Sequence, residues 1–146
     1  MRSLALVAAT TAVLAAHPAL AQDIAYGDDA SEWANDGECD DRRFGGSAMS
    51  AVLLLENVGH DATDCRNLVD SGAIRPWVMA PSLAATQCDA IEFGDDSGTF
   101  SGDAECDDIR FEGIGMASQL SREFLSMDAT DCRAQCDFRT IGLREY

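Results

Sequence analysis

The order of hydrophobic and polar positions in residues 27–66 recurs without a gap in residues 94–133. At this offset of 67 residues, 20 of the 40 aligned positions are identical, and the block Asp-Ala-Thr-Asp-Cys-Arg closes both copies. Self-similarity at a fixed period indicates an internal structural repeat. We therefore expect one small unit of structure to occur twice, with each residue of the first copy matched 67 positions later.

A short strand, an acidic loop and a helix are expected to open each copy. In the first copy, alternating apolar side chains predict the strand over residues 24–26, and the acidic loop follows over residues 28–41. Met49 and Leu53 are four positions apart, which favours a helix over residues 48–58 with both side chains on its buried face. The corresponding segments of the second copy are 91–93, 95–108 and 115–125.

A second helix and a short extended segment are expected to close each copy. Asp61 and Asp128 are in position to cap this helix, with Asp64 and Asp131 as the acidic partners of a capping box. In the first copy the helix ends before Gly72, and in the second copy we expect it to be shorter. The pattern predicts an α+β protein of two tandem disulfide-stabilised modules, each ordered as short strand, acidic loop, helix, helix and short strand.

The N-terminal segment belongs to neither copy. Arg2 precedes an apolar run over residues 4–16, which is followed by an Ala-x-Ala site that ends at Ala21. This pattern is typical of a secretory signal peptide, and the run is too short to span a membrane. We expect cleavage near Ala21 and a secreted or periplasmic protein without a membrane span. The expected boundaries are 1–21 for the signal peptide, 22–75 for module one, 76–87 for a linker and 88–146 for module two.

Acidic residues outnumber basic residues by 26 to 10, which gives a net charge of −16. A protein this acidic lacks the basic patch that nucleic-acid binding requires, so we expect no nucleic-acid partner. The partner is unknown, and a basic protein would complement the charge. Thirteen of the 26 acids lie in the two loops, residues 28–41 and 95–108, so the charge is concentrated at one place in each copy.

Closely spaced carboxylates without a base need a cation to neutralise them. Asp36, Glu38 and Asp40 alternate along the first loop, and calcium takes six to eight oxygen ligands of this kind. The spacing is not that of an EF-hand. The alternative is that these acids only cap helices, pair with arginines or face solvent. The candidate calcium ligands are Asp28, Asp36, Glu38, Asp40, Asp41, Asp61 and Asp64 in the first copy, and Asp95, Asp103, Glu105, Asp107, Asp108, Asp128 and Asp131 in the second.

The six cysteines of an exported chain are expected to form disulfides. Cys39 and Cys65 recur at the same separation in the second copy, as Cys106 and Cys132. Zinc bound by thiolates is the alternative, but no Cys-x-x-Cys motif is present. The repeat therefore favours the pairs Cys39–Cys65 and Cys106–Cys132 and leaves Cys88–Cys136 as the third.

Two resemblances rest on the residues around the first half-cystines. The pattern Trp-Ala-Asn-Asp-Gly-Glu-Cys-Asp-Asp of residues 33–41, followed by Asp-Ala-Thr-Asp-Cys of residues 61–65, is similar to a repeat of uncharacterised exported bacterial proteins. Its Asn-Asp-Gly-Glu-Cys-Asp and Asp-x-x-Asp-Cys elements also resemble Lin-12/Notch repeats, which are small extracellular disulfide-rich modules that bind calcium. The resemblance implies export, bound calcium and a module used alone or joined to others.

These features predict an exported calcium-binding protein that acts as a binding or scaffolding module and is not an enzyme. A metal-free acidic module for protein–protein interaction is the first alternative. A small hydrolase that uses carboxylates is the second. His60 is the only histidine beyond residue 21, and its counterpart in the second copy is Met127. A hydrolase built on a serine needs a histidine base, so the repeat as a whole disfavours this kind of enzyme.

Overall fold

The computed structural model describes residues 24–146. The signal-peptide prediction, residues 1–21, lies outside the described residues. The described chain has a small α+β fold with three disulfides. Its elements are β1 (Phe44–Gly46), β2 (Val52–Leu54), a 3-10 turn (Leu55–Asn57), α1 (Ala62–Asp70), β3 (Ile74–Pro76), α2 (Met79–Ala85), a 3-10 turn (Cys88–Ala90), β4 (Cys106–Asp108), β5 (Phe111–Gly113), β6 (Met116–Ser121), a 3-10 turn (Arg122–Phe124), α3 (Ala129–Asp137) and β7 (Ile141–Leu143).

The two copies of the repeat have matching backbones. Strand β1 pairs antiparallel with β3, and β5 pairs with β7 in the same way 67 residues later. Tyr26 stacks on Phe44 with ring centroids 5.7 Å apart, and the equivalent pair Phe93 and Phe111 stacks at 5.6 Å. Helices α1 and α3 both contain nine residues, so the expectation of a shorter second-copy helix is wrong.

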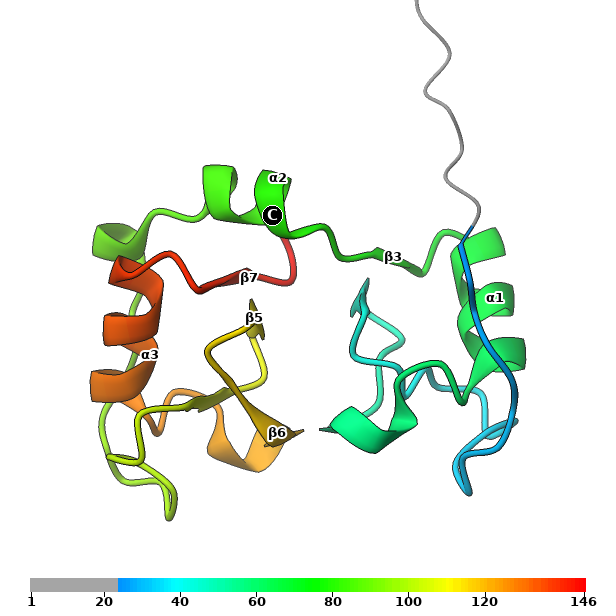
Figure 1. Ribbon diagram of the computed structural model, residues 1–146, viewed down its shortest axis with the longest axis horizontal. Coiled ribbons are helices and arrows are strands. Elements are labelled where there is room, and N and C mark those ends of the chain that lie inside the picture. Colours follow the sequence, from blue (N-terminus) through cyan, green and yellow to red (C-terminus); the bar gives the residue numbers. More distant parts are fainter. Residues whose placement is uncertain (1–23) are drawn as a thin grey trace, which may run out of the picture.

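The copies join through β2 and β6, which pair antiparallel with Leu53 opposite Leu120. These two leucines are equivalent positions of the repeat, so the pairing relates the copies by a local two-fold axis, as in a symmetric dimer. Strand β4 adds to the other edge of β6, which gives the order β2-β6-β4. Figure 1 shows the two copies on either side of this junction, with α1 and α3 at the outer edges.

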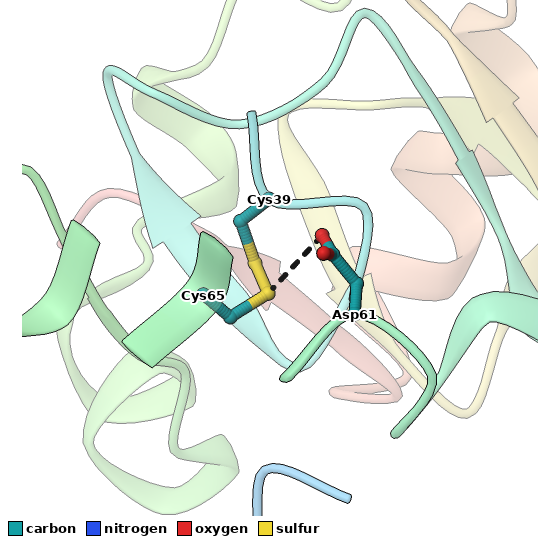
Figure 2. A group of neighbouring side chains, drawn as sticks. All are labelled: Cys39, Asp61 and Cys65. Carbon is teal, nitrogen blue, oxygen red and sulfur yellow. Dashed lines mark hydrogen bonds between the residues drawn. A yellow bond between two sulfur atoms is a disulfide. The ribbon is translucent and has the colours of Figure 1, made fainter. Parts of the chain in front are cut away.

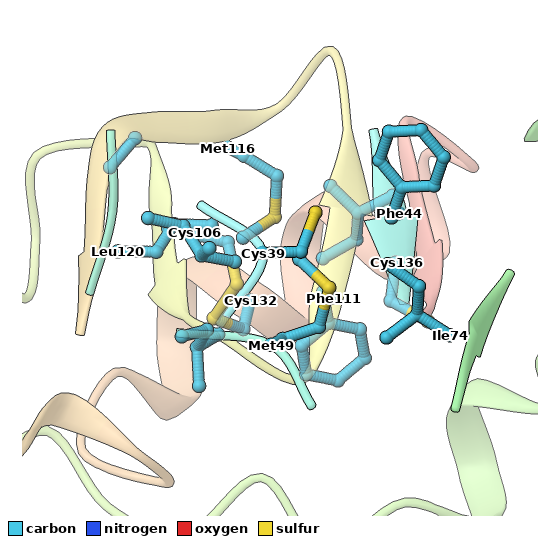
Figure 3. Close-up of a cluster of buried hydrophobic side chains, with 14 of the residues drawn as sticks. Cys39, Phe44, Met49, Ile74, Cys106, Phe111, Met116, Leu120, Cys132 and Cys136 are labelled. Carbon is cyan, nitrogen blue, oxygen red and sulfur yellow. A yellow bond between two sulfur atoms is a disulfide. The ribbon is translucent and has the colours of Figure 1, made fainter. Parts of the chain in front are cut away.

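One hydrophobic core runs through both copies. Leu53 and Leu120 have no exposed surface, and Phe44 and Phe111 are at most 1% exposed. These side chains belong to a single buried cluster that also holds half-cystines of both copies (Figure 3). The two copies therefore contribute side chains to one shared core.

A buried ionic cluster also crosses the junction. The guanidinium of Arg42 donates to both carboxylate oxygens of Glu112, at 2.9 and 3.1 Å. The guanidinium of Arg144 donates to the same carboxylate. It also donates to the backbone oxygen of Arg42 at 2.6 Å. All three residues are buried, with 5%, 9% and 6% of the surface of Arg42, Glu112 and Arg144 exposed. The C-terminal segment is thus held against both copies.

The expected helices over residues 48–58 and 115–125 are instead strands β2 and β6, each followed by a 3-10 turn. A spacing of four is even, so it places Met49 and Leu53 on one face of a strand as well as on one face of a helix. Pairing between the copies then satisfies the backbone groups of both strands. Apolar spacing within one copy does not reveal this partner.

The expected strands over residues 24–26 and 91–93 do not form, because neither segment pairs with another strand. Arginine side chains take up backbone oxygens that a neighbouring strand would otherwise use. The guanidinium of Arg43 lies 3.4 Å from the Tyr26 oxygen, and that of Arg110 lies 3.1 Å from the Glu92 oxygen. Ring stacking, and not strand pairing, anchors these segments.

The segment expected to be a linker, residues 76–87, contains α2 and packs on β7. The Ser82 hydroxyl donates to the Leu143 oxygen at 2.8 Å, and the Leu143 N–H donates to the Thr86 hydroxyl at 2.9 Å. A Cβ at Gly142 would lie 2.3 Å from the Ser82 oxygen, so only glycine allows this approach. The segment is an ordered bridge across the domain (Figure 1).

The disulfides join Cys39 to Cys65, Cys106 to Cys132 and Cys88 to Cys136, which are the pairs that the repeat favours. The first two enclose the same sequence separation of 26 residues, one in each copy. The third ties the 3-10 turn before the second copy to α3. Disulfides of this density are typical of proteins in oxidising compartments. No helix within residues 24–146 is both long enough and apolar enough to cross a membrane.

Candidate functional site

Each copy buries a pair of aspartates beside its own disulfide. Asp40 follows Cys39, and Asp61 immediately precedes α1. The Asp40 N–H donates to Oδ2 of Asp61 at 2.7 Å, and the two residues are only 3% and 1% exposed. In the second copy, Asp107 donates to Asp128 at 2.9 Å, with exposures of 5% and 1%. The disulfide fixes this approach, because it links the loop to the first turn of the helix.

One oxygen of each buried aspartate has no hydrogen-bond partner. These atoms are Asp40 Oδ2, Asp61 Oδ1, Asp107 Oδ2 and Asp128 Oδ1. A buried acceptor without a partner loses its hydration without compensation, at a cost of about 1–3 kcal/mol or more for a charged group. The same two oxygens are unpartnered in both copies, so the cost is a property of the repeat. A bound cation would remove it.

Burial first, and nearby carboxylates second, raise the pKa of Asp40 and Asp61 to about 6. The same cause raises the pKa of Asp107 and Asp128 to about 6. The carboxylates that act on these pairs include Asp36, Glu38 and Asp64 in the first copy, and Asp103, Glu105 and Asp131 in the second. Five acids therefore gather in each copy, and among residues 24–146 none of them forms an ion pair with a base.

The outer members of each cluster are positioned by loop N–H groups. Oδ2 of Asp64 accepts from Gly37 at 2.9 Å, and Oδ1 of Asp36 accepts from Glu38 at 3.0 Å. In the second copy, Oδ2 of Asp131 accepts from Gly102 at 2.7 Å. Each bond uses one oxygen of the carboxylate. These bonds hold the loop against the cluster.

The expected capping roles of Asp61 and Asp64, and of Asp128 and Asp131, are wrong. Asp61 and Asp128 occupy the N-cap positions, but neither side chain makes a capping hydrogen bond. Both carboxylates instead accept an N–H of the preceding loop, which the disulfide links to the helix.

The helices are capped by Asp29 and Asp96, which the sequence did not single out. Asp29 accepts the N–H of Thr63 at 2.8 Å and its hydroxyl at 2.7 Å, and Asp96 binds Thr130 at the same two distances. These bonds lower the pKa of both carboxyls. The only sign of these caps in the sequence is that the aspartate and the threonine are the same residue types at equivalent positions of both copies.

Four of the candidate ligands do not join the buried pairs. Asp41 is bound by the Arg43 side chain and by the Gly59 N–H at 2.7 Å. Asp108 is bound in the same way by Arg110 and Ser126. Asp28 and Asp95 are exposed and bind His60 and Ser97 instead. Asp28, Asp41, Asp95 and Asp108 therefore lie outside the two clusters of five carboxylates.

The Asp61 carboxylate lies against the disulfide, with Oδ2 3.5 Å from Sγ of Cys65 (Figure 2). The equivalent distance from Asp128 to Cys132 is 3.4 Å. A disulfide sulfur carries no proton and no thiolate charge, so this is a packing contact, and the sulfurs are not metal ligands. Zinc bound by thiolates is accordingly not supported at this place.

In the metal-free protein, stability is expected to fall as the pH rises through the range from about 4 to 6. A carboxyl whose pKa is higher in the folded state than the unfolded value of 3.8 favours folding while it is protonated. This stabilisation is complete below the unfolded value and is lost as the pH rises through about 6. Urea unfolding in chelator across this pH range measures the effect.

The double variant Asp61→Asn, Asp128→Asn serves as the control for this pH dependence. It should show a clearly smaller loss of stability over the same range. Asp29 and Asp96 do not interfere, because their lowered pKa values confine their effect to lower pH. An unchanged slope in the double variant would contradict the assignment of the buried acids.

Each cluster thus offers several carboxylate oxygens, held by a loop, a helix start and a disulfide. Such a ligand set suits a hard cation such as calcium better than a soft transition metal. The two clusters are related by the repeat, so they offer two similar sites in one domain. In comparisons with known proteins, no family model, no curated protein and no solved structure matches this chain.

Proposed function

We propose that this is an exported calcium-binding protein that acts as a binding or scaffolding module, with one calcium site in each copy. The observation that carries the proposal is the pair of unpartnered, buried carboxylate oxygens, which occurs identically in both copies. Export is supported by the signal-peptide pattern of residues 1–21 and by the three disulfides.

The buried pair would supply the central ligands of each site. Asp36, Glu38 and Asp64 lie close enough to Asp40 and Asp61 to raise the pKa of at least one of them. Together they provide five carboxylates, which falls within reach of the six to eight oxygens that calcium takes once backbone oxygens or water are added. The equivalent ligands of the second copy are Asp103, Glu105, Asp107, Asp128 and Asp131.

This arrangement favours calcium over magnesium because three of the five carboxylates in the first copy come from a loop of irregular structure. Magnesium demands near-ideal octahedral geometry and gives up its water reluctantly, whereas calcium accepts irregular coordination. The role of the ion would be structural. It would fasten the acidic loop to the start of the helix, next to the disulfide that already links them.

Thermal unfolding in calcium and in chelator tests the proposal. A ligand that binds only the folded state at a hundred times its Kd adds about 2.7 kcal/mol of stability. We expect millimolar calcium to raise Tm by several degrees, and equal magnesium to raise it by much less. Identical melting curves in calcium and in chelator would contradict the proposal.

A further inference from the structure

A pocket of about 340 Å³ opens beside the acidic cluster of the first copy. Three acidic residues, Asp36, Glu38 and Asp40, are among those that line it. Trp33, which is 50% exposed, lines the pocket with an aromatic ring. Val52 and Leu54 add aliphatic surface. No basic side chain is among the residues that line it. The pocket therefore combines negative charge with aromatic and aliphatic surface.

A polar group in this pocket lacks a partner. Asn57 lines the pocket and is 5% exposed, and its Oδ1 accepts from the Ser31 hydroxyl at 3.1 Å. Its amide nitrogen Nδ2 has no hydrogen-bond partner. A buried amide donor without an acceptor is costly. Two residues that line the pocket, Asn57 and Asp40, thus each hold a buried polar atom without a hydrogen-bond partner.

The second copy has apolar side chains at two equivalent positions. The counterparts of Trp33 and Asn57 are Phe100 and Phe124. These two rings pack edge to face with their centroids 5.4 Å apart. The polar, open version in the first copy is therefore not imposed by the fold.

We propose that the pocket of the first copy binds the cationic side chain of an arginine or lysine presented by a basic partner protein. The cationic head would lie among the carboxylates, and the ring face of Trp33 adds a cation–π contact. Val52 and Leu54 would cover the methylene stem, which such side chains readily bury along apolar surface. A backbone oxygen of the partner would accept from Nδ2 of Asn57.

The unpartnered amide favours a peptide over a free polyamine. A polyamine offers only donors and cations, so it leaves Nδ2 of Asn57 without an acceptor. The proposal does not rest on the calcium sites. One divalent ion leaves the five carboxylates of the first copy with a net negative charge, and without calcium the whole charge remains.

The test follows the indole N–H signals of Trp33 and Trp77 by NMR in the purified, disulfide-intact protein, in calcium and separately in chelator. The probe is the end-blocked peptide Gly-Gly-Arg-Gly-Gly, and the control peptide carries uncharged citrulline instead of arginine. We expect the arginine peptide to shift the Trp33 signal saturably. The Trp77 indole donates to the Leu143 oxygen at 3.1 Å and should not move. The citrulline peptide should bind at least about tenfold more weakly.

Matched variants of the two copies localise the binding. Asn57→Phe copies the second-copy residue and should abolish binding of the arginine peptide, whereas Phe100→Ala should leave it unchanged. Trp33→Ala alters a half-exposed side chain and should weaken binding about tenfold, measured by calorimetry. If Asn57→Phe does not fold, the binding measured for Trp33→Ala tests the proposal in its place.

Three results would overturn the proposal. These are equal binding of the two peptides, unchanged binding in both Asn57→Phe and Trp33→Ala, and spermidine binding as tightly as the arginine peptide, which would indicate a site for free polyamines. Because the titrations are run in chelator as well, failure of the calcium sites and failure of the pocket are observed separately.

Discussion

Asp61→Asn is expected to lower the stability of the protein in calcium and to raise it in chelator at neutral pH. In calcium, the variant loses a ligand and with it most of the binding energy of one site, about 2.7 kcal/mol at a hundredfold excess over Kd. In chelator, it removes a buried charge that lies beside other carboxylates. Asparagine still offers an oxygen to the Asp40 N–H, so the loop keeps its hydrogen bond.

This reversal of sign separates a metal ligand from a structural acid. Asp128→Asn should behave in the same way in the second copy. Asp28→Asn is the matched control, because Asp28 is exposed and lies outside the cluster, and it should not change sign between the two conditions. Urea unfolding in each buffer gives the free energies of unfolding. If Asp61→Asn destabilised the protein equally in calcium and in chelator, its carboxylate would have a purely structural role.

Glu112→Gln is expected to destabilise the protein by about 3–5 kcal/mol, with or without calcium. Glu112 is the carboxylate that both Arg42 and Arg144 bind across the junction. Removing its charge leaves two buried guanidinium groups uncompensated. Arg144 is affected most, because burial already lowers its pKa and Glu112 is the largest influence that raises it.

The same variant shows whether the two copies unfold as one unit. We expect a single cooperative transition in urea, at lower denaturant concentration and with an unchanged slope. Glu123→Gln replaces an exposed acid of the same copy and should change stability by about 0.5 kcal/mol or less. A loss below 1 kcal/mol for Glu112→Gln, or two separate transitions, would contradict a single shared core.

The repeat made long-range features predictable that a single copy does not reveal. Because Cys39 and Cys65 recur at the same separation, the pairing reduced to one economical choice, which the structure contains. The end of α1 followed from Ser71-Gly72, and Gly72 has a φ of 76°, which favours glycine. The repeat was sufficient to predict the disulfides, and the residues at the helix end were sufficient to predict where α1 stops.

Features that depend on contact between the copies could not be predicted. The spacing of Met49 and Leu53 fits a helix and a strand equally, and only the β2–β6 pairing decides between them. Within one copy, the pairing of Asp41 with Arg43 is local and was an alternative that the sequence left open. The burial of Asp40 against Asp61, which leaves one oxygen of each without a partner, depends on the path of the chain and could not be predicted.

A native mass spectrum of the disulfide-intact protein in calcium, compared with one in chelator, tests the central claim most directly. We expect the folded protein to carry two calcium ions in calcium, none in chelator, and one in either the Asp61→Asn or the Asp128→Asn variant. The same mass in calcium and in chelator, for protein with a folded charge-state distribution, would contradict the assignment of the two carboxylate clusters as calcium sites.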